Sequence, residues 1–338
     1  MAFFVAMVVY PFFIVWLRRC KVGKTIREDC MTGDKSVIFA SMHAHKAGTP
    51  NMWWAMLLLI MIVMIGLSFV LQHYDLINNS LVTREETYII LFAFFSLGFL
   101  WLLDDYLNVK GRGSIKWLSA KAKLFGMFAI SAFISRWFYS KLGVDYINLW
   151  FGREISLGLF FPFLSFFFTV GLVNAINITD GLDGLAGGLL AIVLAVFIVA
   201  TFMTQLYIAS AVIGILIAVL VAFLWFNINP AKIFLGDGGA FALWWLIASL
   251  VYLLNMRMSI VLPFLFLFLL FRLEIGSSAL QIFWKKVYGK KLFSIAPLHH
   301  RFEYKGEQEW TVVMKAWLLQ WLLALIVLIF LFYQFYAW

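Results

Sequence analysis

The chain has 338 residues, of which 64% are hydrophobic and only 13% are charged, and its formal net charge is +9. A soluble domain carries roughly 25% charged residues, so a large soluble helical protein is excluded, because it could not bury apolar runs of this length. The composition instead predicts an all-α, polytopic integral membrane protein, built as a single transmembrane domain over residues 1–338.

Ten apolar runs long enough to cross a bilayer follow one another along the chain. They fall near residues 2–17, 53–71, 88–103, 124–138, 158–173, 185–204, 207–226, 240–254, 258–273 and 311–337. Basic residues follow the first run and no cleavage site does, so we expect an uncleaved helix. The break at 203–205 is weakly marked, which leaves nine spans open. A short amphipathic helix is expected through Ser278–Val287.

Lysine and arginine are concentrated in alternate loops. Loops 18–52, 104–123, 174–184, 227–239 and 274–310, with the residues at their edges, hold 21 of the 26 Lys and Arg residues. The other five are Arg84, Arg136, Lys141, Arg153 and Arg257. The positive-inside rule places the basic loops in the cytoplasm and both termini outside. This topology and a basic surface facing anionic lipid explain the net charge, so no nucleic-acid partner is expected.

Five aspartates lie in three of the basic loops. Asp104 and Asp105 end the third span in LWLLDDYLNVKG, Asp180 and Asp183 lie in NAINITDGLDGLAGG, and Asp237 lies in FNINPAKIFLGDGG. A single aspartate at a helix end is usually a cap. Three such loops on one side favour a Mg²⁺ site for phosphoryl transfer, since Mg²⁺ takes one or two carboxylates plus water and phosphate. Asp180 and Asp183 are three residues apart, so they would share a face if they lay on a helical turn.

Three basic segments accompany these aspartates. PLHHRFEYKG contains His299 and His300, HAHKAGTPN contains Lys46, and KWLSAKAKL contains Lys121 and Lys123. Lysine is a common phosphate-binding charge, and histidines beside Arg and Lys favour phosphate over zinc, because no cysteine lies near them. The plainer interpretations are a polar interfacial loop for the histidines and a membrane-surface anchor for KWLSAKAKL.

Six segments together resemble a known family. In chain order, HKAGTP, LDDYL, LSAKAKL, NAINITDGLDGLAGG, FNINPAKIFLGD and PLHHRFEYKG resemble the motifs of the polyprenyl-phosphate N-acetylhexosamine-1-phosphate transferases, from about residue 43 to the C-terminus. Within that superfamily the branch that transfers phospho-MurNAc-pentapeptide is the most similar. The resemblance implies ten spans in a bacterial inner membrane and an active site facing the cytoplasm. It also implies transfer from UDP-MurNAc-pentapeptide to undecaprenyl phosphate with Mg²⁺, giving lipid I and UMP for peptidoglycan, and leaves a homodimer open.

The resemblance also implies roles for individual residues. Asp237 is expected to bind the metal, and Asp104 to lie near the acceptor phosphate as its base, with Asp105 alongside. His299 joins these three as a catalytic residue beside the sugar-phosphate. Substrate-binding residues are expected at Lys46, Lys121, Lys123, Asn177, Asp180, Gly181, Leu182, Asp183, Asn227, Phe234 and His300.

Three features depart from the family pattern. Arg301 stands where a third histidine is usual, Trp53 and Trp54 stand where small glycines are usual, and Gly238-Gly239-Ala240 replaces a typical Thr-Gly-Ser. A sister enzyme that uses UDP-GlcNAc would share the aspartate motifs, although PLHHRFEYKG favours the muramoyl branch. A transporter is a further alternative, but it would place charges near the middle of the bilayer and show inverted repeats, which this sequence does not.

Overall fold

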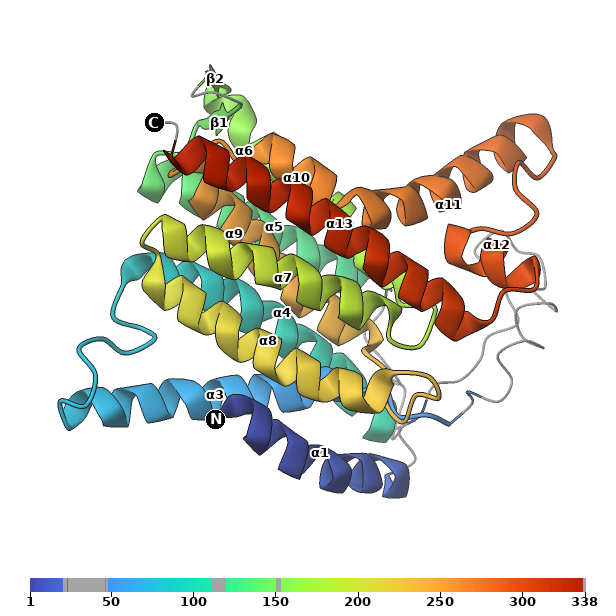
Figure 1. Cartoon of the computed structure of the whole chain (residues 1–338), viewed down its shortest axis with the longest axis horizontal. Helices are drawn as coiled ribbons and strands as arrows, with labels where there is room; N and C mark the ends of the chain where they lie inside the picture. The colour runs from blue at the N-terminus through green and yellow to red at the C-terminus, as the bar shows by residue number, and fades with distance from the viewer. Residues whose placement is uncertain (21–22, 24–45, 47, 111–119, 150–152, 337–338) are drawn as a thin grey trace.

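The computed structural model describes residues 1–20, 23, 46, 48–110, 120–149 and 153–336 (Figure 1). Helices make up nearly all the regular structure of this part. They are α1 (Ala2–Arg19), α3 (Trp53–His73), α4 (Glu85–Lys110), α5 (Ala120–Leu142), η3 (Gly158–Phe160), α6 (Phe161–Thr179), α7 (Leu185–Met203), α8 (Tyr207–Asn227), α9 (Gly236–Asn255), α10 (Val261–Leu267), α11 (Leu269–Tyr288), α12 (Leu298–Tyr304) and α13 (Glu309–Tyr336). The two strands, β1 (Tyr146–Asn148) and β2 (Glu154–Ser156), pair antiparallel.

Eight of these helices are long and apolar enough to cross a membrane, and the bent pair of α10 and α11 makes a ninth. The remaining predicted span corresponds to α5, a helix of 23 residues that carries Arg136 and Lys141 and lies outside this set. The predicted all-α, polytopic membrane fold is therefore confirmed.

Helix α9 forms the centre of the bundle. Its apolar window is entirely buried, and the large side chains of Trp244 and Trp245 are fully enclosed. It packs against α3, α4, α6 and α7. By contrast, only 22% of the corresponding window of α13 is buried, because this helix lies on the outside of the bundle, across its front in Figure 1. The apolar surface of such a helix suits contact with lipid.

The prediction of one continuous helix at 258–273 is wrong. Helix α10 ends at Leu267, and α11 leaves at an angle of 67° and projects from the bundle (Figure 1). Backbone carbonyls freed by such a break need donors in a membrane. The Gln320 side-chain amide donates to the Leu267 carbonyl at 2.8 Å, and the Arg272 guanidinium donates to the Leu265 carbonyl. Helix α11 then continues through Ser278–Val287, where a helix was expected.

Several helices extend beyond their predicted ends. Helix α4 continues to Lys110, so Asp104 and Asp105 lie inside a helix and do not end one. Helix α6 reaches Thr179 and includes Asn177, and α9 begins early enough to hold Asp237 in its first turn. The weakly marked break is confirmed, since α7 ends at Met203 and α8 begins at Tyr207. The β1–β2 hairpin was not anticipated.

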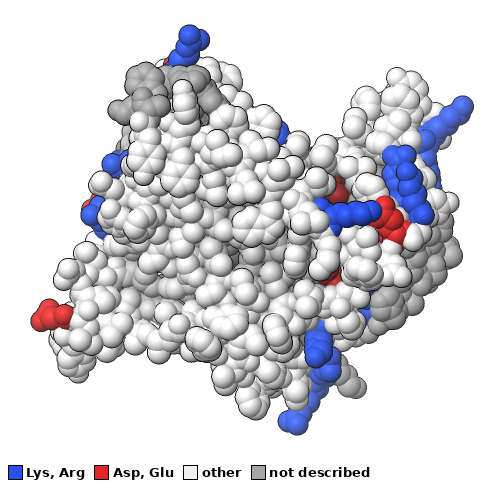
Figure 2. All heavy atoms as spheres, in the orientation of Figure 1, with Lys and Arg blue, Asp and Glu red and all other residues white. Residues whose placement is uncertain are grey.

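On the face drawn in Figure 2, few charged side chains lie in the middle. Figure 2 shows a broad belt of uncharged surface, with the larger groups of Lys and Arg toward the end that holds α11 and α12. Both chain termini lie away from this end (Figure 1). The end marked by α12 and the start of α13 is also where the predicted site residues gather.

Candidate functional site

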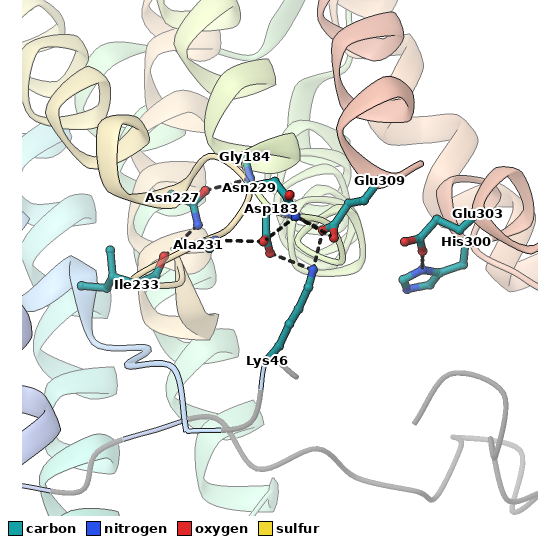
Figure 3. Close-up of polar contacts among 10 residues, drawn as sticks. All are labelled: Lys46, Asp183, Gly184, Asn227, Asn229, Ala231, Ile233, His300, Glu303 and Glu309. Atoms are coloured by element: carbon teal, nitrogen blue, oxygen red, sulfur yellow. Dashed lines mark hydrogen bonds and ion pairs between the residues drawn. The ribbon is translucent and has the colours of Figure 1, made fainter. Parts of the chain in front are cut away.

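Four segments that are distant in sequence meet at this end of the bundle (Figure 3). They are the stretch around Lys46, the α6–α7 loop, the α8–α9 loop and the first turn of α13. At their centre Lys46 Nζ lies 2.8 Å from Asp183 Oδ1 and also donates to Glu309 Oε1. The backbone N–H of Asp183 donates to the same Glu309 oxygen at 2.6 Å. These contacts join the N-terminal part of the chain to its last helix.

Two further groups donate hydrogen bonds to the carboxylates of Asp183 and Glu309. The Asn229 side-chain amide donates to Asp183 Oδ2 at 3.2 Å and to Glu309 Oε2 at 3.1 Å. The backbone N–H of Ala231 donates to Asp183 Oδ2 at 3.0 Å. Every carboxylate oxygen of the pair thus accepts a hydrogen bond. We call Lys46, Asp183, Asn229 and Glu309 the Lys46 cluster.

Three side chains of the Lys46 cluster are largely buried, whereas Asn229 is exposed. The side chains of Lys46, Asp183 and Glu309 are 9%, 3% and 12% exposed. Burial of charge is costly unless the charges are paired and hydrogen-bonded, and here two carboxylates share one ammonium group. The charge of Lys46 is therefore already paired with two carboxylates of the protein, in the absence of any phosphate ligand.

Asn227 ties two of the loops together beside the Lys46 cluster (Figure 3). Its side-chain oxygen accepts from the Gly184 backbone N–H at 3.1 Å, and its side-chain nitrogen donates to the Ile233 carbonyl at 2.8 Å. The next residue, Phe234, is 7% exposed, and its backbone N–H donates to the Pro50 carbonyl at 2.8 Å. The predicted nucleotide residues at 227 and 234 thus both belong to the interface between loops.

Trp317 fixes the start of α13 against α7. Its indole N–H donates to the Gly184 carbonyl at 3.2 Å. A Cβ at Gly188 would lie 2.1 Å from the same ring, so this close packing requires glycine. Because Glu309 lies two turns before Trp317 on α13, this contact helps to place its carboxylate. Glu309 was not among the residues expected from the sequence, where it stands out only as an acid in the first turn of an apolar helix.

The two adjacent histidines are each held by a glutamate. His299 Nδ1 lies 3.0 Å from Glu274 Oε2, and His300 Nδ1 lies 2.7 Å from Glu303 Oε2. The two rings are in edge contact, with centroids 4.2 Å apart. His299 also approaches the α6–α7 loop so closely that a Cβ at Gly181 would lie 2.2 Å from its Nε2. The structure thus joins the histidine segment to the aspartate loop, and Glu274 is a partner that the sequence argument missed.

Helices α4 and α9 bring two other aspartates to the same region. Trp101 of α4 stacks on Phe241 of α9 with ring centroids 4.6 Å apart, and its Cβ lies beside Gly238. Asp104, 2% exposed, is one turn beyond Trp101, and Asp237 directly precedes Gly238. Both aspartates therefore lie within about one turn of the same helix contact.

Two departures from the family pattern contact each other here. A Cβ at Gly238 would lie 2.5 Å from Trp54 Nε1, and a Cβ at Gly239 would lie 3.0 Å from the Trp53 ring. The large tryptophans at the start of α3 thus fill space left by the glycines at the start of α9. The Trp53 indole N–H also donates to the Tyr10 hydroxyl, which links α1 to this packing.

Some predicted residues lie in a different local structure than expected, and others are placed by their backbone alone. Asp180 directly follows the end of α6, and Asp183 lies in the turn before α7, so the two aspartates do not share a helical face. Leu182 is buried between them. The backbone places Asp105 in α4, Asp237 in α9, and Lys121 and Lys123 at the start of α5, while their side chains lie outside the described set.

The chain is similar to known proteins over most of its length. Residues 87–255 match the family described as Glycosyl transferase family 4. The chain is 33% identical over 323 residues to a phospho-N-acetylmuramoyl-pentapeptide-transferase of Listeria monocytogenes serotype 4b (strain CLIP80459), covering 94% of this chain and 91% of that one. It is 34% identical over 345 residues to the protein of the same description in Caldanaerobacter subterraneus subsp. tengcongensis, covering 100% and 96%. The second match takes in every segment of the site.

Proposed function

The chain belongs to glycosyl transferase family 4 and to its phospho-N-acetylmuramoyl-pentapeptide transferases, and on that basis we propose its reaction. The enzyme transfers phospho-MurNAc-pentapeptide from UDP-MurNAc-pentapeptide to undecaprenyl phosphate, forming lipid I and releasing UMP for peptidoglycan synthesis. The proposal is supported above all by the 33–34% sequence identity to these relatives, which extends over nearly the whole of both chains.

The chemistry suits a site at the ends of membrane helices. An oxygen of the lipid phosphate attacks the sugar-linked phosphorus of the donor, and the bond between the two donor phosphates breaks to release UMP. Both reactants are anionic, so the protein mainly has to position them and to offset their charge. The acceptor's hydrocarbon tail stays in lipid while its phosphate reaches the site from the bilayer surface.

The metal is part of the proposal. Among the residues that the structure describes, no three His, Cys, Asp or Glu side chains form a metal site. Mg²⁺ usually takes only one or two protein carboxylates and completes its shell with water and phosphate, so a magnesium site does not require such a group. Asp237 would hold the ion, which would supply charge neutralisation at the donor phosphates. Asp104, with Asp105 beside it on α4, would face the acceptor phosphate, with Lys121 or Lys123 nearby.

The Lys46 cluster is the proposed nucleotide side of the site. Its carboxylates and amide are fixed before any ligand arrives, which lowers the ordering cost of binding. The α6–α7 loop carries Asp180 and Asp183 and touches both this cluster and His299. One loop is therefore positioned to contact the nucleotide at one side and the sugar-phosphate at the other. Because lysine and arginine favour this end (Figure 2), we orient it toward the cytoplasm.

A direct test is to supply the purified protein with undecaprenyl phosphate and either UDP-MurNAc-pentapeptide or UDP-GlcNAc, and to measure UMP release. We expect turnover with the muramoyl donor and a lipid-linked sugar product. Turnover with UDP-GlcNAc alone would assign the chain to the sister activity. No Mg²⁺ requirement in the same assay would remove the metal from the proposal.

A further inference from the structure

Glu274 of α11 holds His299 from one side. Its Oε2 lies 3.0 Å from His299 Nδ1 and accepts a longer bond, 3.4 Å, from the His299 backbone N–H. The two side chains are 14% and 1% exposed, so water does not screen this contact strongly. A carboxylate at Nδ1 keeps a proton on that nitrogen and leaves Nε2 as the ring atom that can meet a ligand.

The other ring nitrogen has no partner within the described part of the chain. His299 Nε2 is buried, makes no hydrogen bond there, and faces the backbone of Gly181. Buried polar atoms are nearly always hydrogen-bonded, and exceptions often mark a functional site. A ligand that separated the ring slightly from Gly181 would give this nitrogen a partner.

We propose that Glu274 is a positioning residue, which fixes the His299 ring so that Nε2 is presented to a phosphate oxygen of the nucleotide-sugar donor. The inference deepens the proposed function and rests on it. Protonated Nε2 donates to the phosphate, while the Glu274 carboxylate balances the positive charge of the ring. The neighbouring Asp180 and Asp183 belong to the same loop as Gly181, so the donor would meet all three positions together.

The length of the Glu274 side chain matches this role. Glu274 reaches His299 from a different helix, so the ring is held between α11 and the α6–α7 loop. His300 is held from within its own short helix, by Glu303 three residues on. The bend that directs α11 away from the bundle therefore also brings Glu274 to the site. Disturbing this glutamate should move the ring without removing any group that touches the substrate.

The first test compares two substitutions of Glu274. In Glu274→Gln the amide oxygen can still accept from Nδ1–H but no longer balances the charge of the ring, so we expect kcat to fall by less than about tenfold. In Glu274→Ala the ring loses its anchor, and we expect kcat to fall about 10- to 100-fold, with KM for the UDP-sugar changed far less. Equal activity of Glu274→Ala and wild type would overturn the proposal, as would a loss confined to KM.

The second test asks whether Glu274 acts through His299. We expect the double variant Glu274→Ala/His299→Ala to be no slower than His299→Ala by more than about twofold. The Gln amide nitrogen can stand near Nε2 and that of Asn near Nδ1, so His299→Gln should retain more kcat than His299→Asn. Independent, multiplying losses in the double variant would overturn the positioning role.

Glu307→Ala serves as the matched control. Glu307 pairs with the exposed Lys315, outside the site, and its removal should leave kcat and KM unchanged. Thermal unfolding in detergent identifies any Glu274 variant that has lost its fold, and the Gln variant keeps the test valid in that case. Should the wild type turn over only UDP-GlcNAc, the proposed donor fails, while the same Glu274 and His299 comparisons are made with that donor.

Discussion

Lys46 and Asp183 are 137 positions apart in the chain, yet Lys46 Nζ lies 2.8 Å from Asp183 Oδ1 in a nearly closed site. The contact makes the stretch before α3 part of the same site as the α6–α7 loop. Lys46 also donates to Glu309 of α13, so its ammonium group connects three regions of the chain.

Replacing Lys46 with methionine should destabilise the protein. The change leaves Asp183 and Glu309 buried together without their cation, and removal of one partner from a buried ion pair typically costs about 3–5 kcal/mol. Thermal unfolding in detergent should show a clear fall in Tm, and UMP should no longer raise it. Lys315→Met is the control, because its side chain is 61% exposed and such a pair contributes at most about 1 kcal/mol. Equal Tm values for the two variants would contradict this account.

Glu309→Gln should weaken donor binding more than it slows chemistry. The amide keeps the shape of the side chain, and its oxygen can still accept from Lys46 and the Asp183 backbone, but it loses the negative charge that strengthens these hydrogen bonds. Such bonds contribute about 1.5–3 kcal/mol each, so we expect KM for the UDP-sugar to rise at least about tenfold. Steady-state kinetics on both substrates would show it. An unchanged donor KM with a lower kcat would place Glu309 in a different role.

Gly181→Ala should inactivate the enzyme while leaving it folded. Its Cβ would lie 2.2 Å from His299 Nε2, so the ring or the loop must move at the position where the donor is expected. Gly171→Ala is the matched control in α6, since nothing lies within 4 Å of its Cβ position, and alanine there should be neutral or stabilise by about 0.5–1 kcal/mol. UMP release and detergent Tm separate the two effects. Full activity of Gly181→Ala would mean that His299 can yield freely.

Trp54 and Gly238 should show strong coupling. Trp54→Gly opens a cavity at a side chain that is 1% exposed, at a cost of about 3–5 kcal/mol. Gly238→Ala places a methyl group 2.5 Å from Trp54 Nε1. In the double variant, loss of the Trp54 ring makes room for the new methyl group. The loss of unfolding free energy should therefore be smaller than the sum of the two single losses, by about 0.5–3 kcal/mol. Unfolding measured for all four proteins would show simple additivity if the contact did not matter.

Asp237→Asn should abolish UMP release without preventing extraction of folded protein. The amide is a poorer Mg²⁺ ligand than the carboxylate, whereas its size is nearly the same. We expect activity at least about 100-fold below wild type, with part of it regained at high Mg²⁺ concentration. Size-exclusion chromatography would check the fold. Substantial activity at ordinary Mg²⁺ would exclude Asp237 as a principal ligand.

The spans were predictable because lipid imposes a length and a polarity on every crossing helix. The loops that meet at the site were also predictable, since their aspartates stand at the edges of apolar runs. The bend after Leu267 was not, because the freed carbonyls are satisfied by Arg272 in the next helix and by Gln320, 53 residues on. Strands of three residues, such as β1, carry too little pattern to detect.

The partners of the predicted residues were likewise hidden. Lys46 and Glu309 are 263 positions apart, and an acid at the start of an apolar helix is usually only a favourable charge near the helix dipole. Glu274 directly follows the predicted span 258–273, and nothing in the local sequence relates it to His299. Local pattern therefore identified the residues proposed to contact substrate, but not the residues that hold them in place, whose positions depend on the assembled bundle.

The interlocking of Trp53 and Trp54 with Gly238 and Gly239 also constrains how this sequence can have diverged. The tryptophans leave no room for larger residues at 238 and 239, and the glycines leave a cavity if the tryptophans are lost. The two pairs of positions must therefore change together during evolution. A chimaera that took only one of the two segments from a relative would be expected to express poorly, whereas a graft carrying both should be accepted.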